Sequence, residues 1–159
     1  MRIAIIGNVA SGKTTLAHQI SKEKNIEITH VDSIQFLPDL SMRPYRQTIE
    51  ILILIQQKPS WIIDGYGPLD ILEKRFEICD QIIFLDPPLW KNYLRLSIRQ
   101  FKNIFSPRSE LPIGSQELTW SHTKKLFKTI SQQHKKMRPE LVRILNREQN
   151  KKKLLLIRS

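Results

Sequence analysis

The chain has 159 residues, 40% of them hydrophobic, so it can bury one good core, and we expect a single domain over residues 1–159. Its one cysteine, Cys79, excludes an internal disulfide and fits a reducing compartment. The longest apolar stretch, residues 49–55, is too short to span a bilayer, and the first strand leaves no room for a cleavable signal. We therefore expect a cytoplasmic protein with no membrane segment.

The net charge of +11 is distributed unevenly. Residues 1–86 carry nine Lys/Arg and eleven Asp/Glu, whereas residues 87–159 carry seventeen and four. A strongly basic half attracts polyanions, so it predicts non-specific binding of nucleic acid at low salt.

The first predicted element is a buried strand over residues 2–6, which runs into the segment GNVASGKTT. This segment has the spacing of a phosphate-binding loop and leads into a helix. Backbone N–H groups and the positive end of the helix dipole there face an anion. We assign the binding of ATP to the nine loop residues: Gly7, Asn8, Val9, Ala10, Ser11, Gly12, Lys13, Thr14 and Thr15.

Two loop residues have chemical roles. Lys13 is long enough to reach the β- and γ-phosphates, and it is a predicted catalytic residue. The hydroxyl of Thr14 is the expected ligand of Mg²⁺.

The following elements alternate between strand and helix. We expect an irregular segment at residues 33–44, helices at residues 44–57 and 68–75, and four more strands at residues 26–31, 61–63, 81–85 and 154–157. Short apolar strands separated by helices predict a parallel sheet covered on both faces.

Three of these strands end in an aspartate: Asp32, Asp64 and Asp86. Ligands of open α/β sheets bind outside the carboxyl ends of the strands. Carboxylates there can hold Mg²⁺ through water or accept a proton from an attacking hydroxyl. We favour such roles for Asp32 and Asp64, and a turn-forming role for Asp86, which two prolines follow.

The basic half contains a predicted helix at residues 89–105. Its apolar residues fall on one stripe, namely Trp90, Leu94, Ile98, Phe101 and Phe105, and a basic stripe lies beside it, namely Lys91, Arg95, Arg99 and Lys102. Arg95 and Arg99 are one turn apart and suit a phosphate clamp, because guanidinium groups offer paired donors.

A Pro/Gly/Ser segment follows, and we expect a short lid at about residues 106–118. A long helical stretch comes next, which Pro139 must kink or break near Arg138. His134 on its apolar stripe is interpreted as a core histidine.

The motifs GNVASGKTT, HVDS, MRP, WIIDGYG, IIFLDPP and LRLSIRQ, in this order, resemble the adenylate kinase-like branch of small P-loop kinases. Within that branch the chain is most similar to bacterial proteins labelled DNA topology modulation proteins. The similarity covers nearly the whole sequence and includes KMRPELVRIL, which contains Arg138.

The resemblance implies an α/β P-loop NTPase fold with a five-stranded parallel sheet in the order 2-3-1-4-5. It also implies ATP with Mg²⁺ and an acceptor on the far side of the cleft. Asp64 falls where such kinases hold Mg²⁺ through water, Arg95 where an arginine packs on adenine, and Arg99 where one contacts the phosphates. The acceptor is assigned to Asp32, Arg43, Asp64 and Arg138, and catalysis to Lys13, Asp32, Arg95 and Arg99.

The chain also departs from adenylate kinases. The segment DGYGPLD has no arginine where those enzymes grip the phosphate of AMP, and the lid segment has no cysteine cluster for zinc.

The favoured function is ATP-dependent phosphoryl transfer to a small molecule: a nucleoside, a nucleotide or another metabolite. The alternative is a nucleic-acid-binding P-loop protein that affects DNA topology. A switch or motor ATPase is disfavoured, because no Asp-Glu pair ends a strand and no guanine-reading motif is present.

Overall fold

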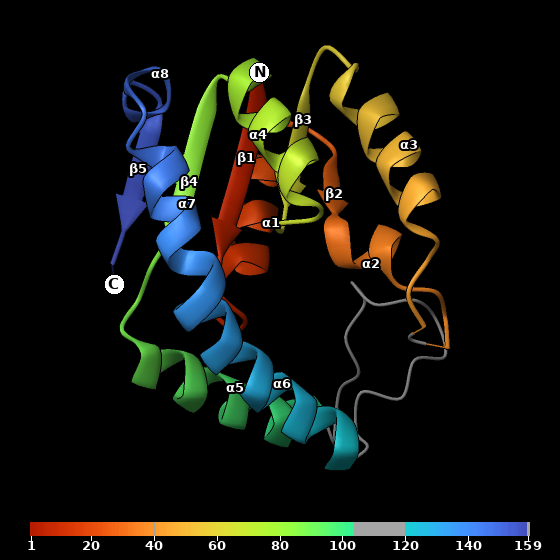
Figure 1. Cartoon of the computed structure of the whole chain (residues 1–159), viewed down its shortest axis with the longest axis vertical. Coiled ribbons are helices and arrows are strands. Elements are labelled where there is room, and N and C mark those ends of the chain that lie inside the picture. The colour runs from red at the N-terminus through yellow and green to blue at the C-terminus, as the bar shows by residue number, and fades with distance from the viewer. Residues whose placement is uncertain (40, 104–119, 159) are drawn as a thin grey trace.

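The structure is a computed structural model, which describes residues 1–39, 41–103 and 120–158. Strands and helices alternate along this part of the chain (Figure 1). The strands are β1 Arg2–Gly7, β2 Ile28–His30, β3 Trp61–Asp64, β4 Gln81–Leu85 and β5 Leu154–Ile157. The helices are α1 Lys13–Lys24, α2 Val31–Gln35, α3 Tyr45–Gln56, α4 Leu69–Ile78, α5 Leu89–Asn103, α6 Trp120–Gln132, the π-helix η1 Gln133–Met137, α7 Arg138–Leu145 and α8 Glu148–Lys151.

The five strands form one parallel sheet in the order β2-β3-β1-β4-β5, which confirms the predicted fold. Parallel strands need crossover connections, and helices supply them here. Ile5 of β1 lies opposite Asp64 of β3, and Gly7 lies opposite Leu85 of β4. The ends of these three strands therefore meet at one edge of the sheet.

Side chains alternate between the two faces of the sheet and make a core on each. Ala4 and Ile6 belong to a cluster with residues of α3, α4 and α7. Ile3 and Ile5 belong to the opposite cluster, which includes Ala17 of α1. Figure 1 shows α4 and α7 in front of the strands.

Helices α5 and α6 lie across the carboxyl ends of the strands (Figure 1). They pack together through Tyr93 and Phe127, whose rings stack with their centroids 5.8 Å apart. The phosphate loop leaves β1 at the same edge. Hydrogen bonds from Asn8 to Ile130 and from Arg95 to Ser11 connect the loop to the α5–α6 pair.

The second strand is shorter than the predicted range of residues 26–31. It ends at His30, and a helical turn begins at Val31 in a segment expected to be irregular. The hydroxyl of Ser33 donates to the carbonyl of His30 at 2.7 Å, and the N–H of Phe36 donates to that of Asp32 at 3.0 Å. Asp32 therefore lies in the first turn of α2 and does not end the strand.

The long helical stretch of the basic half changes its winding ahead of Pro139. The α-helix α6 becomes the π-helix η1 at Gln133 and returns to α-helical winding at Arg138. Proline has no N–H to donate and crowds the preceding turn, which favours irregular winding there. Pro139 was predicted to kink or break the helix near Arg138, and the structure shows a change of winding there rather than a break.

The apolar stripe of α5 does not face the core. Trp90, Leu94, Ile98 and Phe101 are exposed, while Leu96 is fully buried. The helix thus turns a different side toward the molecule. None of the helices in the described ranges is long and apolar enough to cross a membrane.

Candidate active site

The phosphate loop joins β1 to α1 in a conformation that depends on its glycines. A Cβ on Gly7 would lie 2.5 Å from the carbonyl oxygen of Leu85 and 2.7 Å from Oγ of Ser11, so no larger residue fits. Gly12 has φ 99°, a conformation that favours glycine. The ammonium group of Lys13 donates to the carbonyl of Asn8 at 2.8 Å, folded across the loop. The loop thus combines backbone donors with one close cation.

The outer wall of the loop is tied to α6 and η1. The amide of Asn8 donates to the carbonyl of Ile130 at 3.0 Å. The N–H of Val9 donates to Oδ1 of Asn8 at 2.7 Å and to Oε1 of Gln133 at 3.2 Å. The contacts with Ile130 and Gln133 cross more than 120 residues of sequence and hold the loop against α6 and η1.

The two arginines of α5 lie on the same cavity as the loop. Arg95 donates from Nη1 to the carbonyl of Ser11 at 2.9 Å. Arg99, one turn later, also lines the cavity. Cations are therefore present on the side of the loop away from β3. Their predicted contacts with adenine and phosphate stay predictions.

On the other side of the loop, Thr14 and Asp64, the two residues predicted to hold Mg²⁺, are in contact. The hydroxyl of Thr14 donates to Oδ2 of Asp64 at 2.8 Å, and Nδ1 of His30 lies 3.1 Å from the same oxygen. Burial works against ionisation of Asp64, but His30, the charge of Lys13 and Thr14 together keep its pKa below the ordinary value. Asp64 is therefore a carboxylate at neutral pH.

The Thr14–Asp64 pair fits a Mg²⁺ ion. Oδ1 of Asp64 is buried and has no hydrogen-bond partner among the described residues. A hydroxyl and a carboxylate beside a phosphate loop are oxygen ligands of the kind that Mg²⁺ prefers. We therefore regard Thr14 and Asp64, the latter through water, as the residues that would hold the ion.

Asp32 faces the same cavity from α2, together with Gln35 and Phe36. Arg43 is placed differently, because it donates from Nε to the carbonyl of Ile34 at 2.7 Å and is not among the residues that line the cavity. Asp32 and Asp64 therefore line one cavity together with the loop, whereas Arg43 is bonded to α2 and does not line that cavity. The acceptor-binding roles of these residues stay predictions.

The cavity that connects these groups has a volume of about 960 Å³. Ligand pockets of this size hold a nucleotide or a comparable molecule with room for a second small one. The predicted lid at residues 106–118 lies outside the described residues.

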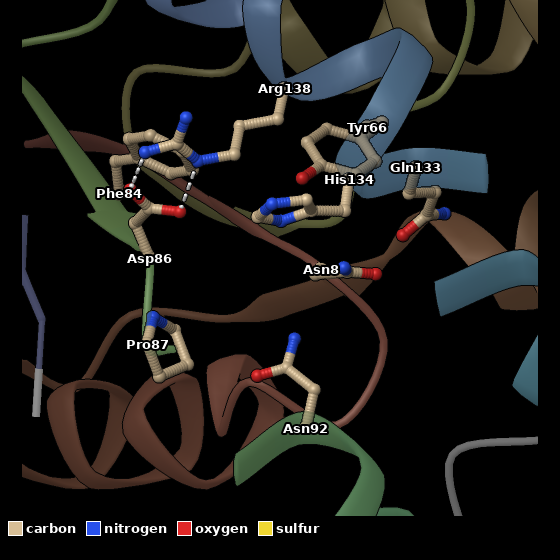
Figure 2. Close-up of a pocket in the computed structure, with 9 residues that line it drawn as sticks. All are labelled: Asn8, Tyr66, Phe84, Asp86, Pro87, Asn92, Gln133, His134 and Arg138. Carbon is tan, nitrogen blue, oxygen red and sulfur yellow. Dashed lines mark hydrogen bonds and ion pairs between the residues drawn. The ribbon is translucent and has the colours of Figure 1, made fainter. Parts of the chain in front are cut away.

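A second, much smaller pocket of about 10 Å³ lies behind the loop (Figure 2). Nε and Nη2 of Arg138 donate to the two carboxylate oxygens of Asp86 at 2.8 and 2.7 Å. Arg138 lines this pocket and not the large cavity, so its predicted contact with substrate has no support from its position. Asp86, interpreted as a turn former, is an ion-pair partner as well.

Tyr66 and His134 point into the small pocket beside this pair (Figure 2). Burial, and then the charge of Asp86, raises the pKa of Tyr66, so its hydroxyl stays protonated. His134 is partly buried in this pocket, so it agrees only in part with its interpretation as a core histidine.

Among the residues of the large cavity that the sequence did not single out are His30 and Gln133. His30 ends β2 at the carboxyl edge of the sheet, and this position was a usable signal. Gln133 reaches Val9 from a helix far along the chain, and no local pattern marks it.

Comparison with known proteins agrees with this architecture. No family model matches the chain, and no curated protein matches it. Among solved structures, shikimate kinase from Bacteroides thetaiotaomicron is 16% identical, with 87% of this chain and 80% of that chain covered and a TM-score of 0.58. Shikimate kinase from Acinetobacter baumannii, in complex with shikimate, is 15% identical, with 87% and 78% covered and a TM-score of 0.55. The chain therefore has a five-stranded parallel fold similar to that of these two solved structures.

Proposed function

We propose that this protein is a kinase that transfers the γ-phosphoryl group of ATP to a small molecule with a hydroxyl group. The observation that carries the proposal is that the phosphate loop and Asp32 line one cavity of about 960 Å³. A donor on the loop and an acceptor beside α2 would share this space.

The residues of the cavity suit the chemistry. In the transfer, a bond forms between the acceptor oxygen and the γ-phosphorus, the bond from that phosphorus to the β,γ-bridging oxygen breaks, and the acceptor proton passes to Asp32. Lys13, Arg95 and Arg99 are cations that can stabilise the charge on the transferred group. Mg²⁺, when held by Thr14 and Asp64, would neutralise phosphate charge.

The comparisons support a kinase through the fold. The two solved structures compared above, with TM-scores of 0.55 and 0.58, are both described as shikimate kinases, and the one from Acinetobacter baumannii is in complex with shikimate. At 15% and 16% identity they do not identify the acceptor of this chain.

The test starts with a screen of nucleosides, nucleotides and hydroxylated metabolites for ATP-dependent phosphorylation. With the acceptor so found, both transfer and background hydrolysis of ATP are measured in Asp32→Asn and Asp64→Asn. Asp32→Asn should lose transfer by at least about a hundredfold, about 2.7 kcal/mol, and keep hydrolysis. Asp64→Asn should lose both, because all turnover needs the metal.

Asp39→Asn is the matched control. Asp39 is an exposed aspartate that bonds to Ser41 and does not line the cavity, so the same change in charge should leave both rates unaltered. If Asp32→Asn abolishes hydrolysis as fully as Asp64→Asn does, Asp32 serves the metal or water, and the assignment of the acceptor side is wrong.

The nucleic-acid alternative is supported by charge alone. Lys124, Lys125, Lys128, Lys135 and Lys136 are exposed on α6 and η1, and such a face attracts any polyanion. The comparisons give no support to a role in DNA topology.

We propose one domain over residues 1–159, with its lid at about residues 106–118.

A further inference from the structure

Arg75 of α4 is a fully buried cation that the proposed mechanism does not use. Its side chain is 0% exposed. Nη1 donates to the carbonyl of Gly65 at 2.7 Å, and neither Nε nor Nη2 has a hydrogen-bond partner within the described residues. A buried arginine is normally paired on every side, so this one has unused donors.

Two apolar side chains lie near the guanidinium. A Cβ built on Gly67 would lie 3.3 Å from Val31, 3.4 Å from Leu52 and 3.5 Å from Nη2 of Arg75, so these groups share one small space. In the part of the chain that the structure describes, no carboxylate is bonded to Arg75. Burial lowers the pKa of Arg75 to about 10, while Cys79 and Asp64 oppose the change, so the side chain stays charged at neutral pH.

Such an arrangement is costly for stability, because a buried charge without a partner loses its hydration and gains little in return. An apolar residue of similar length would fill the same space at lower cost. The charge of Asp64 and the carbonyl of Gly65 offset part of this cost, and the donors Nε and Nη2 remain without a hydrogen-bond partner among the described residues.

The large cavity lies directly beyond the turn that covers Arg75. Gly65, Tyr66 and Gly67 line the cavity on the side of Asp32 and His30. Gly65 is fixed from two directions, because its N–H donates to the carbonyl of Ile5 at 3.0 Å and its carbonyl accepts from Arg75. Gly67 therefore lines the cavity and also lies beside Nη2 of Arg75, so the turn lies between the guanidinium and the cavity.

We propose that the acceptor carries an anionic group, a carboxylate or a phosphate, that binds against the Gly65–Gly67 turn and is attracted by the buried charge of Arg75. This inference rests on the proposed function. Arg75 would then be the cation of the acceptor side, because the segment DGYGPLD contains no arginine. It predicts that the enzyme selects acids over neutral compounds of the same shape.

The test compares Arg75→Met, which removes the charge, and Arg75→Lys, which keeps it, with Lys74→Met. Lys74 is the exposed neighbour on α4, so its variant makes the same change in net charge outside the core. With the phosphate loop saturated by a non-hydrolysable analogue of ATP, which also fills the γ-phosphate site, inorganic phosphate is titrated and binding is measured by calorimetry. Wild type, Arg75→Lys and Lys74→Met should bind phosphate, and Arg75→Met should lose about tenfold or more in affinity.

Two further measurements separate recognition from a merely structural role. Arg75→Met should resist urea as well as wild type or better, since an unpaired buried charge is removed. With any acceptor from the screen, wild type should prefer the acid to its neutral amide, and Arg75→Met should lose this preference through a raised KM. The preference of the wild-type enzyme needs no variant and stands even if Arg75→Met does not fold.

The outcomes distinguish this inference from the proposed function. Phosphate binding that depends on Arg75 without transfer to any acceptor would support the anion site and contradict the kinase. Transfer that is indifferent to the charge of the acceptor, or phosphate binding that is equal in wild type and Arg75→Met, would overturn the anion site and leave the kinase.

Discussion

The ion pair between Asp86 and Arg138 should make a measurable contribution to stability. It joins the end of β4 to the start of α7 by two charge-assisted hydrogen bonds of 2.8 and 2.7 Å. Breaking a fully buried pair costs about 3–5 kcal/mol, and an exposed pair contributes about 0.2–1 kcal/mol. Asp86 is 11% exposed but Arg138 is 37% exposed, so solvent screening reduces the first value. We expect Arg138→Met to lower the free energy of unfolding by about 1–3 kcal/mol.

The assay is urea unfolding of Arg138→Met, Asp86→Asn and the double variant. The coupling energy of this cycle isolates the pair from other effects of each substitution. Arg143→Met is the control on the same helix, because Arg143 pairs with Glu140 while 64% and 38% exposed, and its loss should lower stability less than the loss of Arg138 does. If Arg138→Met costs no more than Arg143→Met, or the coupling is near zero, the pair does not anchor α7. A raised KM for the acceptor in Arg138→Met, at unchanged kcat, would instead revive its predicted contact with substrate.

Three more predictions follow from the loop, the core and the surface charge. Gly7→Ala should reduce ATP affinity at least about tenfold and destabilise the fold by about 1–3 kcal/mol, because the new Cβ would lie 2.5 Å from the carbonyl oxygen of Leu85. ATP binding that calorimetry finds unchanged in this variant would contradict the prediction. Burial raises the pKa of Cys79 to about 11, so the native protein should resist iodoacetamide at pH 8 and react only in urea, as mass spectrometry can measure. Binding of duplex DNA, followed by fluorescence anisotropy, should fall steeply with salt and show no sequence preference, and a salt-resistant, sequence-selective complex would favour the nucleic-acid alternative.

Local patterns were sufficient for most of the sheet. The strand ranges 81–85 and 154–157 are found as predicted, because β-branched and leucine runs between turn residues have few other stable conformations. The phosphate loop was also visible, since its spacing is fixed by the anion that it binds. The sheet order came from the resemblance and is confirmed.

Long-range contacts were beyond the reach of these patterns. Periodicity separated the apolar and basic stripes of α5, but it could not tell that Arg95 faces the cavity while Trp90 faces solvent. Arg75 lies among charged residues in LEKRFEI and has the sequence context of an exposed arginine. Its burial depends on how α4 packs against the turn after β3. The pairing of Asp86 with Arg138, 52 residues apart, likewise depends on tertiary structure.

The π-helix at Gln133–Met137 makes the length of this segment as important as its chemistry. It lies between Ile130, whose carbonyl accepts from Asn8 of the phosphate loop, and Leu141, which is buried in the core. Each residue advances an α-helix by about 100°. A π-helical turn closes i→i+5 hydrogen bonds and so holds one residue more than an α-helical turn. Deleting one residue from this segment should let it return to α-helical winding with α6 and α7 near their present orientation, whereas inserting one should rotate α7 relative to α6 by about that angle. We therefore expect this stretch to tolerate many substitutions, and a single-residue deletion better than a single-residue insertion.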